Sequence, residues 1–188
     1  MYTIRNFEIR TEISEFTVAE FEIIGSILKV EDSEVLERYF NLLEYLKLPE
    51  EILYDLTDAE LFAAIGSFNI QKPEIYLVPS FELGGYTYRA YPDGEEFVLR
   101  AKDLALIEKA GQDESKLLSR LLSIIFKRED LSNKEHYEPA HMKHKAKLFG
   151  ELNAGEMYPY LIHITKRINQ QMDGHLKSVS ENTQSVTQ

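Results

Sequence analysis

The segment 33–46, SEVLERYFNLLEYL, carries apolar residues at helical spacing. A broad apolar face with three- and four-residue steps is typical of an amphipathic helix that covers a core. The segment 115–126, SKLLSRLLSIIF, repeats this pattern when the chain is shifted by 82 positions. We therefore predict a helix in each segment. The face of the first helix consists of Val35, Leu36, Tyr39, Phe40, Leu42, Leu43 and Leu46.

Two further stretches, LTDAEL at 56–61 and LNAGEM at 152–157, predict helix starts. Thr57 and Asn153 can each accept a hydrogen bond from a first-turn N–H group. The side chain of a glutamate three positions later can in turn accept one from the backbone N–H of the capping residue. The two stretches are 96 positions apart. A third capping box, TVAE at 17–20, opens the first helix of the chain.

A shift of 83 sets the apolar positions of 18–27 on those of 101–110, so three predicted helices recur in the same order, with position offsets of 83, 82 and 96. The larger last offset places extra residues within 127–147. Amphipathic helices align with one another easily, so the common order is what favours an internal duplication. We expect two similar three-helix units.

Strands are predicted before each helical unit. In FEIRTEI at 7–13, apolar and charged residues alternate with the period of a half-buried strand. Between 76 and 97, two apolar runs flank Gly84-Gly85, a pair that suits a tight hairpin turn. We expect these strands to form a small antiparallel sheet between or beside the helical units. The predicted fold is α+β and mainly helical.

The domain organisation follows from these elements. Residues 1–75 would hold the first strand and first helical unit, 76–97 the hairpin connector, and 98–170 the second helical unit with the insertion 127–147. Apolar periodicity fades after about residue 170, so 171–188 is predicted to be a flexible polar tail.

Charge narrows the class of partner. The 188 residues carry a net charge of −11, which disfavours nucleic acid or an anionic membrane as the main partner. Residues 1–75 hold 16 Asp and Glu against 6 Lys and Arg, whereas residues 97–170 hold 10 against 13.

No segment has the apolar length of a membrane span or signal peptide, and cysteine is absent. We expect a soluble, unexported protein.

One cluster could in principle bind a metal: His136, Glu138, His141 and His144. Met142, Ala146 and Phe149 would form the buried face of its helix, which would turn His141 and His144 toward solvent among lysines. The spacing also matches no HExxH motif. A solvated insertion without metal is the expectation, and a metal-dependent enzyme is the less favoured reading.

Other catalytic signals are weak. His163 lies in an apolar helical pattern that favours a packed histidine, and Ser26-x-x-Lys29 lacks the companion motifs of acyl enzymes. Gly84-Gly85 lacks the following helix of a phosphate loop. No carboxylate pair stands out as an acid–base couple. We expect no enzyme activity, no catalytic residues and no cofactor.

Aromatic residues gather on the predicted hairpin. The chain has 11 Tyr and 10 Phe, and a small sheet cannot easily bury both its faces. Packing against the helices accounts for most such side chains. An aromatic face left over would suit protein binding, and its candidate residues are Phe81, Tyr86, Tyr88 and Tyr91.

The order of these patterns resembles that of small proteins encoded among the morphogenesis genes of tailed bacteriophages. The resemblance covers roughly residues 7–170. The insertion 127–147 and the polar tail depart from it. The stretches that carry it are FTVAEFEIIGSIL, EVLERYFNLLEYL, LPEEILYDLTDAELFAAIGSF, FELGGYTYRAY, LRAKDLALIEK and LLSRLLSIIFK.

The resemblance implies a non-enzymatic phage assembly protein, such as a tail-assembly chaperone. It would cover an unassembled structural protein, for example a tape-measure chain, in the cytoplasm of the infected bacterium. The alternative that the resemblance implies is a permanent accessory component of the virion head, connector or tail. Self-association into a homo-oligomer is left open.

Overall fold

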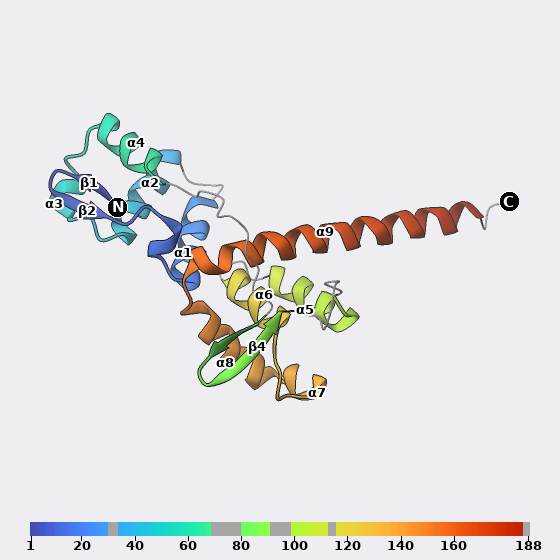
Figure 1. Cartoon of the computed structure of the whole chain (residues 1–188). Coiled ribbons are helices and arrows are strands. Elements are labelled where there is room, and N and C mark those ends of the chain that lie inside the picture. The colour runs from blue at the N-terminus through green and yellow to red at the C-terminus, as the bar shows by residue number, and fades with distance from the viewer. Residues whose placement is uncertain (30–33, 69–79, 91–98, 113–115, 186–188) are drawn as a thin grey trace.

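The computed structural model describes residues 1–29, 34–68, 80–90, 99–112 and 116–185. This part of the chain is mainly helical and contains two small antiparallel sheets, which confirms the predicted α+β class. Figure 1 shows two lobes and a long C-terminal helix that extends away from them. We call residues 1–68 lobe 1 and residues 80–168 lobe 2.

Lobe 1 begins with a hairpin of β1 (Tyr2–Ile4) and β2 (Phe7–Ile9). Arg5 and Asn6 between them have positive φ angles of 45° and 71°, as a two-residue turn between twisted strands requires. The strand predicted over 7–13 is therefore shorter than expected and pairs with the residues that precede it. The chain then turns through the short 3-10 helix η1 (Ile13–Glu15).

Four helices complete lobe 1: α1 (Val18–Lys29), α2 (Val35–Tyr45), α3 (Glu50–Leu53) and α4 (Asp58–Gly66). Their apolar faces enclose a first core with the hairpin. This core includes Ile4, Ile9, Phe16, Ile24, Leu42, Leu43, Leu46, Leu48, Leu53, Leu61 and Ala64, and it takes one residue, Ala154, from the far end of the chain.

Lobe 2 contains a three-stranded sheet in the order β3-β4-β5. Strands β3 (Ser80–Leu83) and β4 (Tyr86–Ala90) form the predicted hairpin, with Gly84 and Gly85 at φ 59° and 79°. The third strand is β5 (Phe126–Arg128), which pairs with β4. The prediction that the N-terminal strand shares this sheet is wrong, because β2 is already paired with β1.

The helices of lobe 2 are α5 (Ala101–Gly111), α6 (Leu117–Ile125), α7 (Asn133–His136), α8 (Pro139–Gly150) and the first part of α9 (Ala154–Ser185). Although they include buried His136 and Lys145, the described residues of the predicted solvated insertion, 127–147, are mostly exposed or half-buried. Those residues form most of β5, all of α7 and the larger part of α8, and α8 packs along α6. Phe149 just beyond them is fully buried in the second core.

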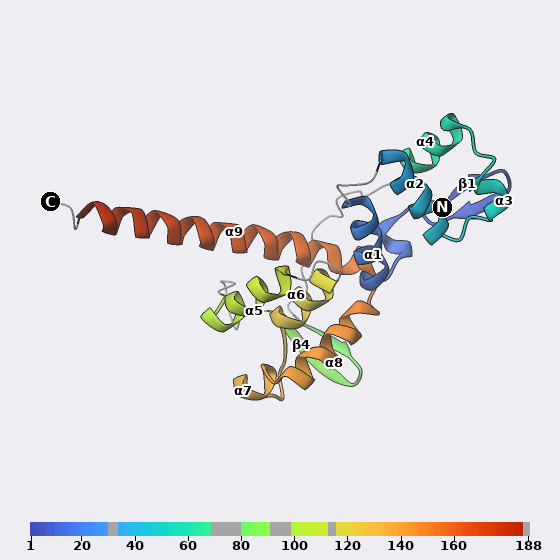
Figure 2. The same cartoon turned by 180° about the vertical axis from the view of Figure 1, so that it is seen from behind.

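Helix α9 runs through most of the predicted polar tail, 171–188. Its backbone stays helical to Ser185, about 48 Å at 1.5 Å per residue. Figures 1 and 2 show its C-terminal half leaving both lobes behind. The loss of apolar periodicity does not end the helix, because a helix already nucleated by packing extends through residues of ordinary helix propensity.

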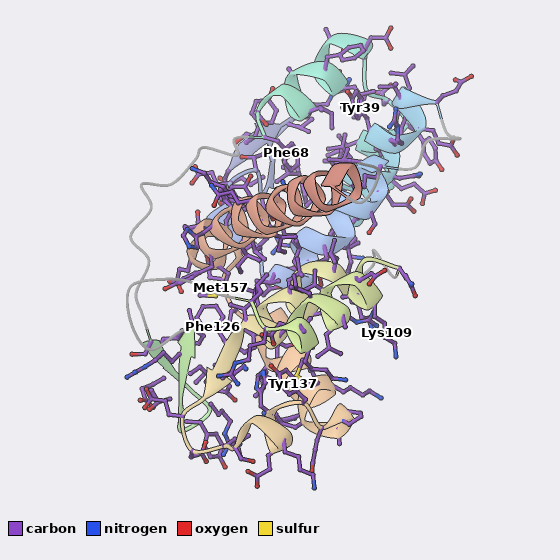
Figure 3. The ribbon with its side chains drawn as sticks, turned by 90° about the vertical axis from the view of Figure 1, so that its right-hand side faces the viewer. Tyr39, Phe68, Lys109, Phe126, Tyr137 and Met157 are labelled. Atoms are coloured by element: carbon purple, nitrogen blue, oxygen red, sulfur yellow. The ribbon has the colours of Figure 1, made fainter. Side chains whose placement is uncertain are left out.

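The two lobes meet where α1 and α9 begin. Thr17 and Asn153 form an antiparallel bridge, and the Val18 N–H donates to the Leu152 carbonyl at 2.8 Å. Gly155 permits this contact, since a Cβ there would lie 3.0 Å from the backbone of η1. Figure 3, which looks nearly along α9, shows this helix lying between the lobes.

A buried carboxylate adds a second link between the lobes. Glu22 of α1 is 6% exposed and accepts hydrogen bonds from the Ser119 backbone N–H at 2.9 Å and from its hydroxyl at 3.1 Å. Ser119 lies in the first turn of α6, where N–H groups lack partners within the helix. Burial raises the pKa of Glu22, while the bonds from Ser119 oppose that rise.

The predicted helix starts are confirmed, whereas the duplication stays a prediction. Thr17 and Thr57 form reciprocal capping boxes with the glutamates three residues on, and Asn153 accepts from the Glu156 N–H. Helices α1 and α2 pack against each other in lobe 1, and helices α5 and α6 do so in lobe 2. The third helices have different neighbours: α4 contacts β1, and α9 contacts η1, α1 and α6.

These caps generate a stability prediction. Asn153→Ala and Thr57→Ala each remove an acceptor from a helix start, so each lowers the free energy of unfolding by about 0.5–2 kcal/mol. Asn153→Ala has the larger effect, because Asn153 Nδ2 also donates to the Ser14 carbonyl at 2.7 Å and so joins the lobes. Urea unfolding measures both, with Thr57→Ser as the control. Unchanged stability in both alanine variants would contradict the prediction.

Candidate functional site

An apolar pocket of about 240 Å³ opens on lobe 1. Residues from the β2–η1 segment, α1, α2 and the C-terminal end of α4 enclose it, and eight of the ten are hydrocarbon side chains. Tyr39 and Phe68, which line it, are labelled on this lobe in Figure 3. The lining residues are Thr11, Ile13, Phe16, Phe21, Ile24, Leu28, Tyr39, Leu42, Ile65 and Phe68.

Exposed apolar side chains accompany this pocket. Within the described residues, seven of the eight exposed large hydrophobic side chains belong to lobe 1. Leu28 lines the pocket and is 37% exposed, and Phe62, 54% exposed, packs edge-on against the ring of Tyr39. We call Leu28, Tyr39, Phe62 and Phe68 the apolar face. Exposed apolar surface next to a pocket is typical of interaction sites.

The charge around this face is negative. Residues 1–68 hold 15 Asp and Glu against 5 Lys and Arg. All three arginines of residues 1–68 bond within the lobe: Arg5 to Asp55 and Glu60, Arg10 to Glu20, and Arg38 to the Leu28 carbonyl. Such internal pairing leaves an acidic surface, which favours encounter with a basic partner.

Two of the four aromatic residues predicted to bind a partner pack in the core of lobe 2. Tyr88 is 1% exposed, and Phe81 is half-buried with its ring 4.9 Å from that of Phe126. Strand β5 and helix α8 supply the residues that cover this side of the sheet, which is why the aromatics belong to the core. Tyr86 is 44% exposed, with the Arg128 guanidinium 3.4 Å from its ring centroid. Tyr91 lies outside the described residues.

The three histidines of residues 136–144 differ in how far they are buried. His136 is 1% exposed, His141 is half-buried and His144 is exposed. Solvent exposure was therefore wrongly predicted for His141, since α8 turns residues 141, 145 and 149 inward. No group of three or more possible metal ligands occurs among the described residues. The absence of a metal remains a prediction.

Sequence reasoning missed a buried lysine beside these histidines. Lys145 is fully buried, and its Nζ donates to the Phe126 carbonyl at 2.8 Å and to His136 Nδ1 at 3.0 Å. His136 Nε2 lies 3.2 Å from the Ile124 carbonyl, so the neutral imidazole with its proton on Nε2 satisfies both contacts.

A second set of polar groups adjoins Lys145. The Tyr137 hydroxyl donates to the fully buried Asp103 carboxylate at 2.7 Å and accepts from Lys127 Nζ at 2.9 Å. The backbone N–H of Arg100 also donates to Asp103, at 3.0 Å. We call Asp103, Lys127, His136, Tyr137 and Lys145 the buried polar cluster. Its bonds tie α5, β5, α7 and α8 together.

Burial shifts the protonation of this cluster. Desolvation, with a smaller contribution from nearby Lys127, lowers the pKa of Lys145 to about 6. Desolvation and the charge of Lys145 lower the pKa of His136 to about 3, and burial raises the pKa of Asp103. A neutral amine is the chemical requirement for a nucleophilic lysine. Lys145, however, has no exposed surface at which a substrate could reach it.

Comparisons with known proteins leave the geometry as the basis for a functional assignment. No family model, curated protein or solved structure matches the chain. Among the helices of the described residues, none has the length and apolar content needed to cross a membrane. Within the described chain, the pocket with its apolar face is the feature best suited to bind another molecule.

The buried polar cluster predicts a pH dependence of stability. The pKa of Lys145 is about 6 in the folded state against 10.5 for the free side chain, so between these values the unfolded chain binds the extra proton. Stability therefore rises with pH across this window, by about 1.4 kcal/mol per pH unit from this one group. Denaturant unfolding from pH 7 to 9 measures the slope.

Lys145→Met removes one titrating amine and should lower that slope, whereas Lys143→Met, at an exposed position of the same helix, should leave it unchanged. A slope that is equal in the unmodified protein and both variants would show that Lys145 is protonated in the folded protein.

Proposed function

We propose that the protein is a non-enzymatic assembly protein, which binds an unassembled structural protein of a tailed bacteriophage through the pocket of lobe 1. The observation that carries the proposal is an apolar pocket, continuous with an exposed apolar face, on the acidic lobe. The phage context rests on the sequence resemblance over roughly residues 7–170. The corresponding place of action is the host cytoplasm.

The size of the pocket supports a protein partner over a small molecule. Pockets for small-molecule ligands and cofactors commonly measure about 300–1,000 Å³ and combine apolar walls with several placed polar groups. This pocket is about 240 Å³ and offers Thr11 and the Tyr39 hydroxyl as side-chain polar groups. It suits the insertion of one or two large apolar side chains from a polypeptide, the usual anchors of a protein interface.

The negative charge of lobe 1 indicates which kind of partner segment it can bind. A partner segment with apolar anchors and flanking lysine or arginine would match both the pocket and the excess of Asp and Glu. Apolar contact would supply most of the affinity, while the acidic surface would mainly speed encounter. Covering such a segment would keep an unassembled chain from aggregating through its exposed apolar residues.

The runner-up is a permanent virion component, and one observation favours it. The C-terminal half of α9 extends away from both lobes (Figures 1 and 2), as a helix that locks into a neighbouring subunit would. Quantitative protein analysis of purified particles separates the two functions. A chaperone is absent from the particles, whereas a structural component is present at a fixed copy number.

A matched pair of variants tests the pocket. Leu28→Glu places a charge in the pocket, and Ile23→Glu places the same charge on the same helix at a similarly exposed residue outside the pocket lining. In pull-downs from phage-infected cells, Leu28→Glu should weaken capture of the structural partner at least about tenfold, a loss of about 1.4 kcal/mol. Ile23→Glu should capture it normally.

Salt gives an independent readout of the same interaction. Association with the partner should slow as ionic strength rises, because the Debye length shrinks from about 10 Å at 0.1 M to about 3 Å at 1 M.

Circular dichroism of Leu28→Glu and Ile23→Glu checks that both variants fold. Equal capture by the two variants, or complete loss of capture on Tyr86→Ala alone, would move the binding site away from lobe 1.

A further inference from the structure

Thr11 is a polar residue in the wall of the apolar pocket of lobe 1. It lines the pocket and is 5% exposed. Its backbone N–H donates to the Glu15 carboxylate at 2.8 Å, whereas its side-chain hydroxyl makes no hydrogen bond with any described residue. A buried hydroxyl without a partner lowers stability, so a bound molecule that supplies the partner recovers what folding loses.

The oxygen of this hydroxyl can be reached from the pocket. Among the described residues, the polar side-chain atoms that are fully enclosed and lack a partner are Arg38 Nε and His141 Nε2. Within the same residues the Thr11 oxygen is also unpaired, and since it is not one of these enclosed atoms, it keeps accessible surface. Because Thr11 is otherwise buried and lines the pocket, that surface opens into the pocket.

Burial places Thr11 at the inner end of the pocket. Phe16, Ile24 and Leu42 are the other lining residues that are buried. Leu28 is exposed, and the remaining lining residues are half-buried. A side chain that enters past Leu28 therefore meets hydrocarbon first and the hydroxyl last.

This order of apolar and polar surface restricts which side chain a partner can insert. The ten lining residues, all of them described, include no charged group, so an inserted lysine, arginine or carboxylate would bury its charge unpaired. Leucine or phenylalanine would leave the Thr11 hydroxyl without a partner. Tyrosine carries a hydroxyl at the far end of an apolar ring, whereas tryptophan carries its N–H on the side of a larger ring system.

The pocket is large enough for the ring of a tyrosine. In another protein, a cavity of about 150 Å³ lined by Leu, Ile and Phe holds benzene. At about 240 Å³, the pocket of lobe 1 has room for one substituted ring. Phe16, Phe21, Tyr39 and Phe68 give it aromatic walls, which favour edge-to-face contacts with an inserted ring.

We infer that the pocket receives a tyrosine of the partner, whose hydroxyl bonds to the Thr11 hydroxyl at the inner end. The inference rests on the proposed function, because it takes the pocket as the binding site. The tyrosine belongs to a segment that also carries lysine or arginine, since residues 1–68 hold 15 Asp and Glu against 5 Lys and Arg. Thr11 sets the specificity, and the hydrocarbon lining supplies most of the affinity.

Side-chain analogues test this assignment on the purified protein. 4-Methylphenol represents tyrosine, and toluene represents phenylalanine. In NMR titrations, 4-methylphenol should shift the methyl signals of Ile24, Leu28 and Leu42, which line the pocket. The ratio of the two dissociation constants, toluene over 4-methylphenol, should fall about three- to tenfold in Thr11→Val, which keeps the side-chain shape and loses the hydroxyl. Thr11→Ser, which keeps a hydroxyl, should retain most of the ratio.

Thr11→Val also separates binding from stability. Because it removes a hydroxyl that the described residues leave unpaired, it should not destabilise the free protein in urea unfolding. It should nevertheless weaken capture of the structural partner from infected cells by about three- to tenfold, and Thr11→Ser should recover most of that loss. A threonine with a purely structural role would show the reverse, with lower stability and unchanged capture in Thr11→Val.

Three results with the analogues overturn the inference: no shift of the pocket methyl signals by 4-methylphenol, an unchanged ratio in Thr11→Val, or a ratio that falls in Tyr39→Phe instead. Unchanged capture by Thr11→Val, together with lost capture by Leu28→Glu, would overturn the inference and keep the proposed function. Normal capture by Leu28→Glu would overturn the proposed function, and the inferred tyrosine with it, even where the purified protein prefers 4-methylphenol.

Discussion

The Glu22 carboxylate, buried in α1 and bonded to Ser119 at the start of α6, fixes the arrangement of the molecule. A buried carboxylate without donors would be strongly unfavourable, so the first turn of α6 has to stay against α1. The same helix contributes Val18 to the core of lobe 2 and Ile24 to the core of lobe 1. Because α1 belongs to both cores, neither lobe can rotate without exposing apolar surface.

This shared helix decides which surfaces are left for function. The residue before its N-terminal end, Thr17, forms the bridge to Asn153 at the start of α9, and Glu22 binds Ser119 of α6. Its C-terminal part is left to line the pocket through Ile24 and Leu28. In lobe 2, Phe81, Tyr88 and the buried polar cluster are taken up by packing and internal hydrogen bonds. Lobe 1 therefore carries the pocket and most of the exposed large apolar side chains of the described residues.

Local signals explain what could be predicted from the sequence. The capping boxes at Thr17 and Thr57 and the glycine turn at 84–85 depend on neighbouring residues, and all three occur as expected. Features that depend on distant partners were missed. Lys145 looks like any lysine of a basic helix, and only the carbonyl of Phe126 and the ring of His136 make its burial tolerable. Tyr88 was assigned to a binding face because nothing in its own segment shows that β5 would pair beside it.

The central claim is that lobe 1 holds the binding site. Hydrogen–deuterium exchange on the complex captured from infected cells, compared with the free protein, tests it most directly. The account predicts slower exchange around Leu28 of α1, around Tyr39 of α2, and from the C-terminal end of α4 to Phe68, because these residues line the pocket. Exchange in the β3–β4 hairpin should not change. Protection confined to the hairpin, with lobe 1 unaffected, would contradict the account.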